Sequence, residues 1–161
     1  DSEFNGDISE WDVSNVTDMS CIFQRSKFTG DISNWDVSNV KNMGSVFSYS
    51  KFNGDLSKWD VSNVEDMTAM FYGSKFTGKN GDISNWDVSN VTNMTLMFEK
   101  AKYNGDISKW DVSNVKYMAH MFKGSSFNGY ISKWNVSPTT DMTGMFDKCP
   151  LQNYPPRWYK R

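Results

Sequence analysis

The stretch DISEWDVSNVTDMSCIF, residues 7–23, decides how the chain is read, because most of the later sequence repeats it with variations. Its tryptophan, Trp11, recurs five more times, at intervals of 24, 24, 27, 24 and 24 residues. A fixed period of this length is typical of repeat proteins, in which each unit packs against its neighbours. We therefore predict one array of about six repeats of 24 residues, which offers a ligand a surface rather than a pocket.

Large apolar residues occupy fixed columns in each unit. Ile8, Trp11, Val13, Val16 and Met19 follow the spacing of a leucine-rich repeat. Two features depart from that motif, because Trp and Met replace Leu, and Val stands where the motif has Asn. Side chains alternate across a strand, so Trp11 and Val13 would share one side. We predict a short strand here, with the Trp column in the core.

After Met19 the spacing becomes helical, because Met19, Ile22, Phe23 and Ser26 lie at i, i+3, i+4 and i+7. An Asp or Asn precedes this segment in every unit except the fifth, which has Tyr117, and these residue types are preferred helix N-caps. The predicted fold class is an α/β solenoid similar to leucine-rich repeats. It has a parallel β-sheet on one face and short helices on the other.

The ends and the turns complete the predicted architecture. The last unit loses the pattern and prolines come after it, so we predict a repeat solenoid over residues 1–149 and a C-terminal cap over residues 150–161. Pairs such as Thr29-Gly30 between units predict turns in which glycine takes a positive φ. Cys21 and Cys149 belong to the first and last units, too far apart for a disulfide, and should be free thiols. The column of Cys21 varies and looks unconstrained.

Composition excludes several classes of function. The net charge is −2, with both signs mixed along the chain and no basic stripe, so no nucleic-acid partner is expected. No apolar run approaches the length of a membrane span. His120 is the single histidine, and no Ser-His-Asp set, phosphate-binding glycine loop or Cys/His metal motif accompanies it. We expect no enzymatic activity, no cofactor and no metal centre.

Two polar columns accompany the predicted strand. Asn15, Asn39 and their equivalents should form a ladder of amides bonded to backbone groups, with N-glycosylation as the alternative. A row of Asp residues, each followed two positions later by Ser, should lie on the outward face of the sheet. The candidate binding residues on this face are Glu10, Asp12, Asp36, Lys58, Asp60, Asp87, Lys109 and Asp111.

Stacked carboxylates repel one another, and two explanations for their presence stay open. Hydrogen bonds from the neighbouring Ser residues and nearby lysines could offset the repulsion. Alternatively, the row binds a cation such as calcium or a ligand rich in hydroxyls or amines. Calcium prefers six to eight oxygens, and one Asp and one Ser per unit supply too few without further carbonyls or water. A second row, Asp7 and its equivalents, comes after the glycine and is interpreted as turn chemistry.

The repeated W-D-V-S-N-V-x-x-M-x-x-M-F, followed by F-N-G-D-I-S, resembles the short surface-protein repeats of the BspA-like leucine-rich-repeat group, across about residues 4–146. Such repeats are abundant in surface lipoproteins of mycoplasma and Listeria and in marine microbes. The resemblance implies an extracellular, cell-surface domain, and it carries over no ligand residues.

The expected function is adhesion or protein recognition through the sheet face, with a protein or glycan ligand on another cell or in a matrix. Two alternatives remain. One is a structural spacer or matrix element, and the other is a cation- or glycan-binding module that uses the Asp and Ser rows. The oligomeric state is left open.

Overall fold

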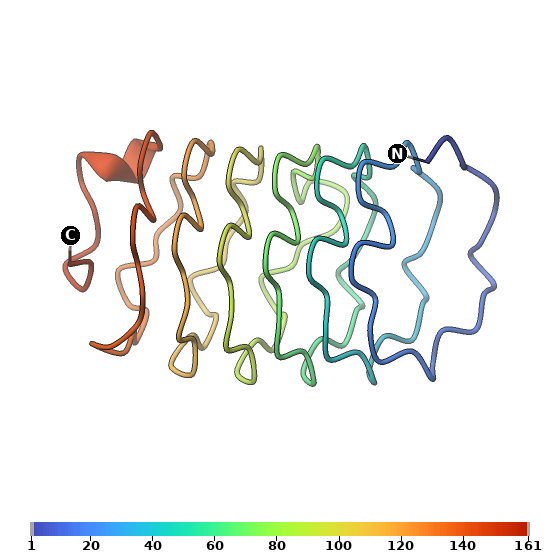
Figure 1. The fold of residues 1–161 in the computed structure, drawn as a ribbon, viewed down its shortest axis with the longest axis horizontal. Coiled ribbons are helices and arrows are strands. Elements are labelled where there is room, and N and C mark those ends of the chain that lie inside the picture. Colours follow the sequence, from blue (N-terminus) through green and yellow to red (C-terminus); the bar gives the residue numbers. More distant parts are fainter. Residues whose placement is uncertain (1, 161) are drawn as a thin grey trace.

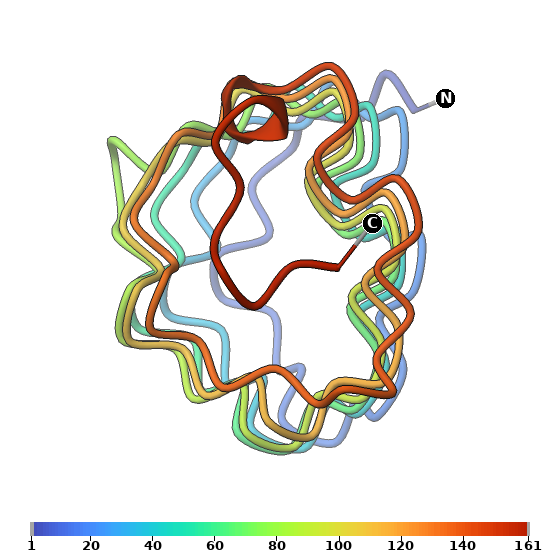
Figure 2. The same cartoon turned by 90° about the vertical axis from the view of Figure 1, so that its left-hand side faces the viewer.

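The structure, a computed structural model, describes residues 2–160. Successive repeats wind as coils of similar size that stack along one axis, with the N-terminal coil at one end and the C-terminal coil at the other (Figure 1). Viewed along that axis, the coils superpose as loops around a shared interior (Figure 2). The three extra residues of the fourth repeat fall in a surface turn, around Asn80.

The predicted α/β solenoid is wrong, and so is the leucine-rich-repeat assignment. Within residues 2–160 the one regular element is the 3-10 helix η1, Pro150–Gln152, and there is no α-helix and no strand longer than an isolated bridge. Single parallel β-bridges join one residue of each coil to the next; they link, in order, Asp18, Asn42, Asp66, Asn93, Tyr117 and Asp141. The coils consist of turns, with neither a sheet nor helices.

Two tight turns replace the predicted strand. The N–H of Trp11 donates to the carbonyl of Ile8 (3.1 Å), and the N–H of Val16 donates to the carbonyl of Val13 (2.9 Å). The next four coils repeat both bonds, and the last coil repeats the first bond but makes the second one residue later, from Thr140 to Ser137. A turn of this kind brings residues i and i+3 close together. Consequently the spacing of Ile8, Trp11, Val13 and Val16 arises from turns, although it equals that of a leucine-rich repeat.

The predicted helix is replaced by a ladder between coils. Every second N–H from Met19 to Arg25 donates to a carbonyl of the next coil at 2.7–3.0 Å. Of the N–H groups between them, those of Ile22 and Gln24 donate three residues back, and that of Ser20 donates to the carboxylate of Asp18. The φ angles of Cys21 and Arg25 are positive, 61° and 54°. A segment this short is marginal as a helix, and here half of its N–H groups join coils. The Cys21 column is therefore constrained, contrary to the prediction.

Side chains join the coils on the side where the backbone does not. The indole nitrogen of Trp35 donates to the carbonyl of Ile8 (3.0 Å), and the amide nitrogen of Asn39 donates to the carbonyl of Ser14 (2.8 Å). Both bonds recur in the following coils. The predicted asparagine ladder is confirmed. Because these bonds pair the indole N–H groups and the Ser14-type carbonyls at the turns, they fix each coil in register with its neighbour.

Aromatic columns fill the interior. The rings of Phe47 and Phe71 stack at a centroid distance of 5.7 Å, and those of Phe71 and Phe98 stack at 5.5 Å. The Trp column from Trp35 onward is buried, as predicted. Trp11 is 58% exposed, because no described coil precedes the first one. Large rings stacked in register supply most of the apolar area that stabilises such an array.

The segment after the last coil closes the C-terminal end of the stack. Figure 2 shows it crossing the end of the coils. Trp158 stacks on Trp134 at 6.0 Å and donates its indole N–H to the carbonyl of Ile131 (2.9 Å). Each Trp from Trp35 to Trp134 donates the same hydrogen bond to the preceding coil, and Trp110 stacks on Trp86 at 6.4 Å. Trp158 therefore takes the place that the tryptophan of a further coil would occupy.

The glycines between units have a different role from the predicted one. Gly30 does not have a positive φ; in that column Gly78, at the insertion, does (76°). A Cβ atom added to Gly30 would lie 2.8 Å from the ring of Phe28, and the corresponding glycines of other coils show the same contact. Glycine is needed because the ring packs directly on its backbone. Cys21 and Cys149 are free thiols, as predicted.

Candidate functional site

All eight predicted binding residues are exposed, but they lie on turns and no sheet supports them. Glu10 belongs to the first turn of its coil, and Asp12 opens the second. The residues equivalent to them occupy the same positions in the later coils, so the stack arranges them in two parallel columns. The exposed members are Glu10, Asp12, Asp36, Lys58, Asp60, Asp87, Lys109 and Asp111. We call the columns of Glu10 and Asp12 the Asp face.

Each carboxylate of the Asp12 column is held by the serine two residues later. One oxygen of Asp36 accepts hydrogen bonds from the N–H (3.1 Å) and the hydroxyl (2.6 Å) of Ser38. Asp12 repeats both bonds with Ser14, and the remaining members accept the N–H at 3.0 Å. The second oxygen of each carboxylate accepts no hydrogen bond from residues 2–160. The predicted bonding to serine is confirmed, and one oxygen per coil is left for a ligand.

These hydrogen bonds also lower the pKa values of the carboxyl groups. The hydroxyl and N–H of the partner serine lower the pKa values of Asp12, Asp36 and Asp111 below their ordinary 3.8, because both donors stabilise the charged form. The turn row behaves similarly: the N–H and then the hydroxyl of its serine lower the pKa values of Asp7, Asp31 and Asp106.

A pH dependence of stability is expected from the direction of these shifts. A carboxyl whose pKa is lowered by folding contributes stability above its unfolded pKa, and the contribution is lost as the pH falls through the folded pKa. We expect the melting temperature to change little between about pH 7 and 5 and to fall below about pH 4. Thermal melts followed by circular dichroism across this range check it. A melting temperature that stays level or rises below about pH 4 would contradict it.

The column of Glu10 gives the Asp face its variation. It runs Glu10, Asn34, Lys58, Asn85, Lys109 and Lys133, and every member is exposed. Lys58 donates to the side-chain oxygen of Asn34 (3.2 Å), so neighbouring coils interact here through side chains alone. The core columns hardly vary over the same repeats. This column therefore changes from acidic to basic along the stack, while the column beside it stays acidic from Asp12 to Asp111.

No cation site is assembled by the acidic rows. Residues 2–160 contain no group of three or more His, Cys, Asp or Glu side chains placed to hold a metal ion. One oxygen of each Asp12-column carboxylate already accepts bonds from its serine. The oxygen that remains in each coil falls short of the six to eight that calcium prefers.

A second group of exposed residues was missed by sequence reasoning. Tyr49 and Tyr72 pack edge to face at 4.9 Å, Arg25 lies over the Tyr49 ring (5.8 Å), and the Lys100 ammonium lies over the Tyr72 ring (5.2 Å). Lys100 also donates to the Tyr72 hydroxyl (2.9 Å), which lowers the pKa of that tyrosine. The available signal was the column of Arg25, which varies where a structural column repeats one residue type; it reads Arg25, Tyr49, Gly73, Lys100, Gly124 and Lys148.

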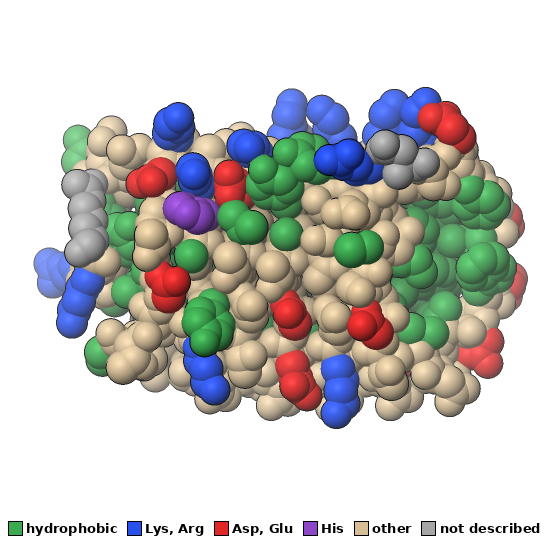
Figure 3. Space-filling model, viewed as in Figure 1, with side chains coloured by type: hydrophobic (Ala, Val, Ile, Leu, Met, Phe, Trp, Pro, Cys, Tyr) green, Lys and Arg blue, Asp and Glu red, His purple; other side chains and the backbone are tan. Residues whose placement is uncertain are grey.

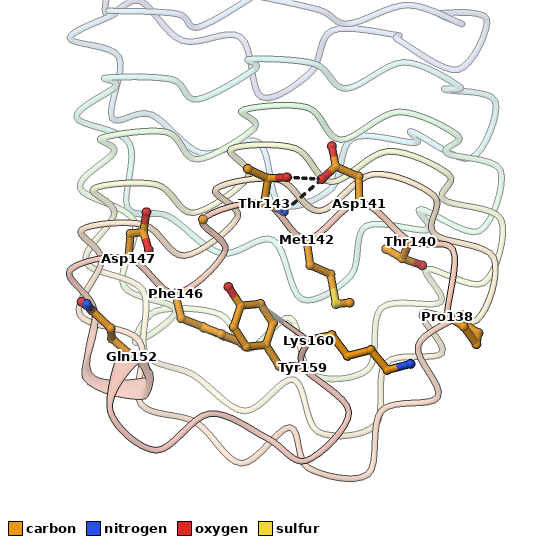
Figure 4. Close-up of a pocket in the computed structure, with 11 residues that line it drawn as sticks. Pro138, Thr140, Asp141, Met142, Thr143, Phe146, Asp147, Gln152, Tyr159 and Lys160 are labelled. Carbon is orange, nitrogen blue, oxygen red and sulfur yellow. Dashed lines mark hydrogen bonds between the residues drawn. The ribbon is translucent and has the colours of Figure 1, made fainter.

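A hollow in the described surface lies at the C-terminal end, beside the closing segment (Figure 4). It has a volume of about 580 Å³ and is lined by residues that include Met142, Phe146 and Tyr159. One oxygen of Asp141 in its wall accepts the N–H (3.0 Å) and the hydroxyl (2.7 Å) of Thr143. This is the turn chemistry of the other coils.

One protein family matches nearly the whole chain. The family described as "Mycoplasma protein of unknown function, DUF285" matches residues 1–82 and again residues 72–158. The chain belongs to this family. The DUF285 match supports the mycoplasma part of the resemblance noted in the sequence, and it does not extend to the leucine-rich-repeat group.

Two further comparisons found no match for this DUF285 chain. The search of curated proteins and the search of solved structures both returned no significant match. Among residues 2–160 of the DUF285 chain, no helix has the length and apolar character needed to cross a membrane.

Proposed function

We propose that this chain is a non-enzymatic recognition domain that binds a protein ligand at a cell surface through the Asp face. The observation that carries the proposal is the row of carboxylates at Asp12, Asp36, Asp60, Asp87 and Asp111. Each is held in one orientation by its serine, and each keeps one oxygen without a hydrogen bond to residues 2–160.

Such a row suits a ligand with regularly spaced hydrogen-bond donors. Groups that are already ordered lose less conformational entropy on binding, so their contacts contribute more to affinity. The neighbouring column from Glu10 to Lys133 varies in charge. A ligand shifted along the stack by one coil would therefore meet different charges, which favours one alignment over another. The resemblance of the WDVSNV repeats to short repeats of bacterial surface proteins supports a location outside the cell.

A pair of matched variants tests the proposal. In one, Asp12, Asp36, Asp60, Asp87 and Asp111 are all replaced by Asn. In the control, Asp7, Asp31, Asp55, Asp82 and Asp106 of the turn row are replaced by Asn. Both remove five charges, and Asn keeps an oxygen for the turn, as Asn42 and Asn93 do for the N–H groups of Gly44 and Thr95. Both variants should therefore fold.

The variants and the parent are assayed against immobilised extracellular-matrix proteins and against a glycan array. We expect the parent to bind at least one matrix protein, the Asp12-row variant to bind it at least tenfold more weakly, and the control to bind within about twofold. Blank arrays would contradict the proposal and favour the spacer. Binding on the glycan array alone that is lost in the Asp12-row variant, or a melting temperature raised by calcium, would favour the cation- or glycan-binding alternative.

A further inference from the structure

Stacking of the coils brings positively charged side chains together along one edge, although they are far apart in the sequence. We define the basic edge as residues 24–27 and the four equivalent segments of the next coils, 48–51, 72–75, 99–102 and 123–126. Its cations are Arg25, Lys27, Lys51, Lys75, Lys100, Lys102 and Lys123, and its one anion is Glu99. Figure 3 shows Lys and Arg side chains concentrated along the upper edge of the molecule.

The backbone holds these side chains in line. The N–H of Lys51 donates to the carbonyl of Ser26, and the N–H of Lys75 donates to the carbonyl of Ser50, both at 3.1 Å. Strand-like pairing of this kind spaces neighbouring chains by about 4.8 Å. The lysines therefore recur at about that interval in a row parallel to the stack axis, and an extended polyanion could lie along the row.

Acidic side chains neutralise little of this charge. Glu3 pairs with Lys27 (2.7 Å), and the buried carboxylate of Glu99 lies 3.8 Å from Lys100. Within residues 2–160, Arg25, Lys51, Lys75, Lys102 and Lys123 form no ion pair. A line of uncompensated cations creates a positive potential that attracts anions, even though the net charge of the chain is −2.

Two tyrosines lie within the line of cations. Tyr49 is 45% exposed, although most aromatic side chains of the protein are buried in the stack. Its ring packs against Tyr72, and Arg25 and Lys100 bracket the pair. The edge thus offers an aromatic surface with cations on both sides, which is suited to a ligand that combines anionic groups with the C–H faces of sugar rings.

We propose that the basic edge binds a sulfated polysaccharide that lies parallel to the stack axis. A nucleic acid fits less well. Proteins that bind single strands stack successive bases on several aromatic faces, whereas Tyr49 and Tyr72 pack against each other. Duplex readout uses a helix or ribbon that enters a groove, and residues 2–160 provide neither. The edge lies on different columns from the Asp face, so this proposal is independent of the proposed function.

Heparin serves as the probe, with fully desulfated heparin and a single-stranded oligothymidylate as comparison ligands. The test variant is Lys51→Gln with Lys75→Gln. The matched control is Lys58→Gln with Lys109→Gln, which removes two exposed lysines from the Asp face. A third variant, Tyr49→Ala, removes the exposed ring. Thermal melts verify that each variant folds, which is expected because these side chains are exposed.

We expect the parent to bind heparin in low salt, to release it as salt rises, and to bind desulfated heparin far more weakly. The Lys51/Lys75 variant should lose roughly tenfold in heparin affinity, and the control should stay within about twofold. Tyr49→Ala should also weaken binding. Absence of heparin binding, equal losses in both lysine variants, equal binding of desulfated heparin, or tighter binding of the oligothymidylate would overturn the proposal.

Discussion

Replacing Trp59 with Ala should lower the free energy of unfolding by about 3–5 kcal/mol, the range found for buried aromatic truncations. The Trp59 side chain is 3% exposed, and its ring lies 6.0 Å from that of Phe47. Its indole N–H donates to the carbonyl of Ile32 (3.0 Å), so truncation also removes a buried hydrogen bond that joins two coils. Urea denaturation followed by circular dichroism measures the change.

Trp11 provides the matched control for that experiment. It belongs to the same column, but it is exposed, and no described coil precedes it to supply a carbonyl for its indole. We expect Trp11→Ala to cost under about 1 kcal/mol, as is usual at exposed positions. Equal costs at Trp11 and Trp59 would contradict the interior that we describe.

Replacing Ser45 with Pro should cost about 3 kcal/mol or more, because two features of this position exclude proline. The φ angle of Ser45 is 58°, whereas the proline ring fixes φ near about −65°. The N–H of Ser45 donates to the carbonyl of Thr68 in the next coil (2.7 Å), and proline has no N–H. Chemical denaturation of the variant gives the change in unfolding free energy.

The same substitution separates the observed ladder from the predicted helix. In a helix capped by Asn42, residue 45 would lie in the first turn, where proline is tolerated. Ser45→Gly is the control, since glycine adopts a positive φ without a Cβ clash. We expect Ser45→Gly to leave stability unchanged or raised by up to about 1 kcal/mol. A proline variant as stable as the parent would contradict the ladder.

The period and the buried columns could be predicted from the sequence, because both depend on side-chain type alone. The Trp column, the asparagine ladder and the free cysteines were all predicted in this way. The element types could not be. Tight turns at Ile8–Trp11 and Val13–Val16 place apolar residues at the same spacing as a leucine-rich repeat, so periodicity did not separate the two.

The ladder segment was misread for a related reason. Met19, Ile22 and Phe23 have helical spacing, and local bonds three residues back produce that spacing without a helix. In a sequence, a positive φ angle is usually indicated by glycine. In the Cys21 column glycine appears only at Gly144, and the other positions hold Cys, Ser, Ala, Leu and His. The sequence thus lacked the signal that would have excluded a helix.

The two candidate sites also differ in whether they could be predicted from the sequence. The bond between Asp36 and Ser38 is local, so the D-x-S pattern was sufficient to predict it. The basic edge is not local. Lys27, Lys51 and Lys75 stand 24 residues apart and come together only when the coils stack. Because positive and negative residues are mixed along the chain, the sequence did not indicate the basic edge.

The most direct test is the φ angle of Ala69, measured by solution NMR from scalar couplings and chemical shifts. It shows whether this segment is a ladder between coils or a helix. Our structure predicts a positive angle near 53°, with the N–H of Ala69 bonded to the carbonyl of Thr95 in the next coil (2.8 Å). A negative φ of about −63°, the value of an α-helix, with that N–H bonded four residues back would contradict it.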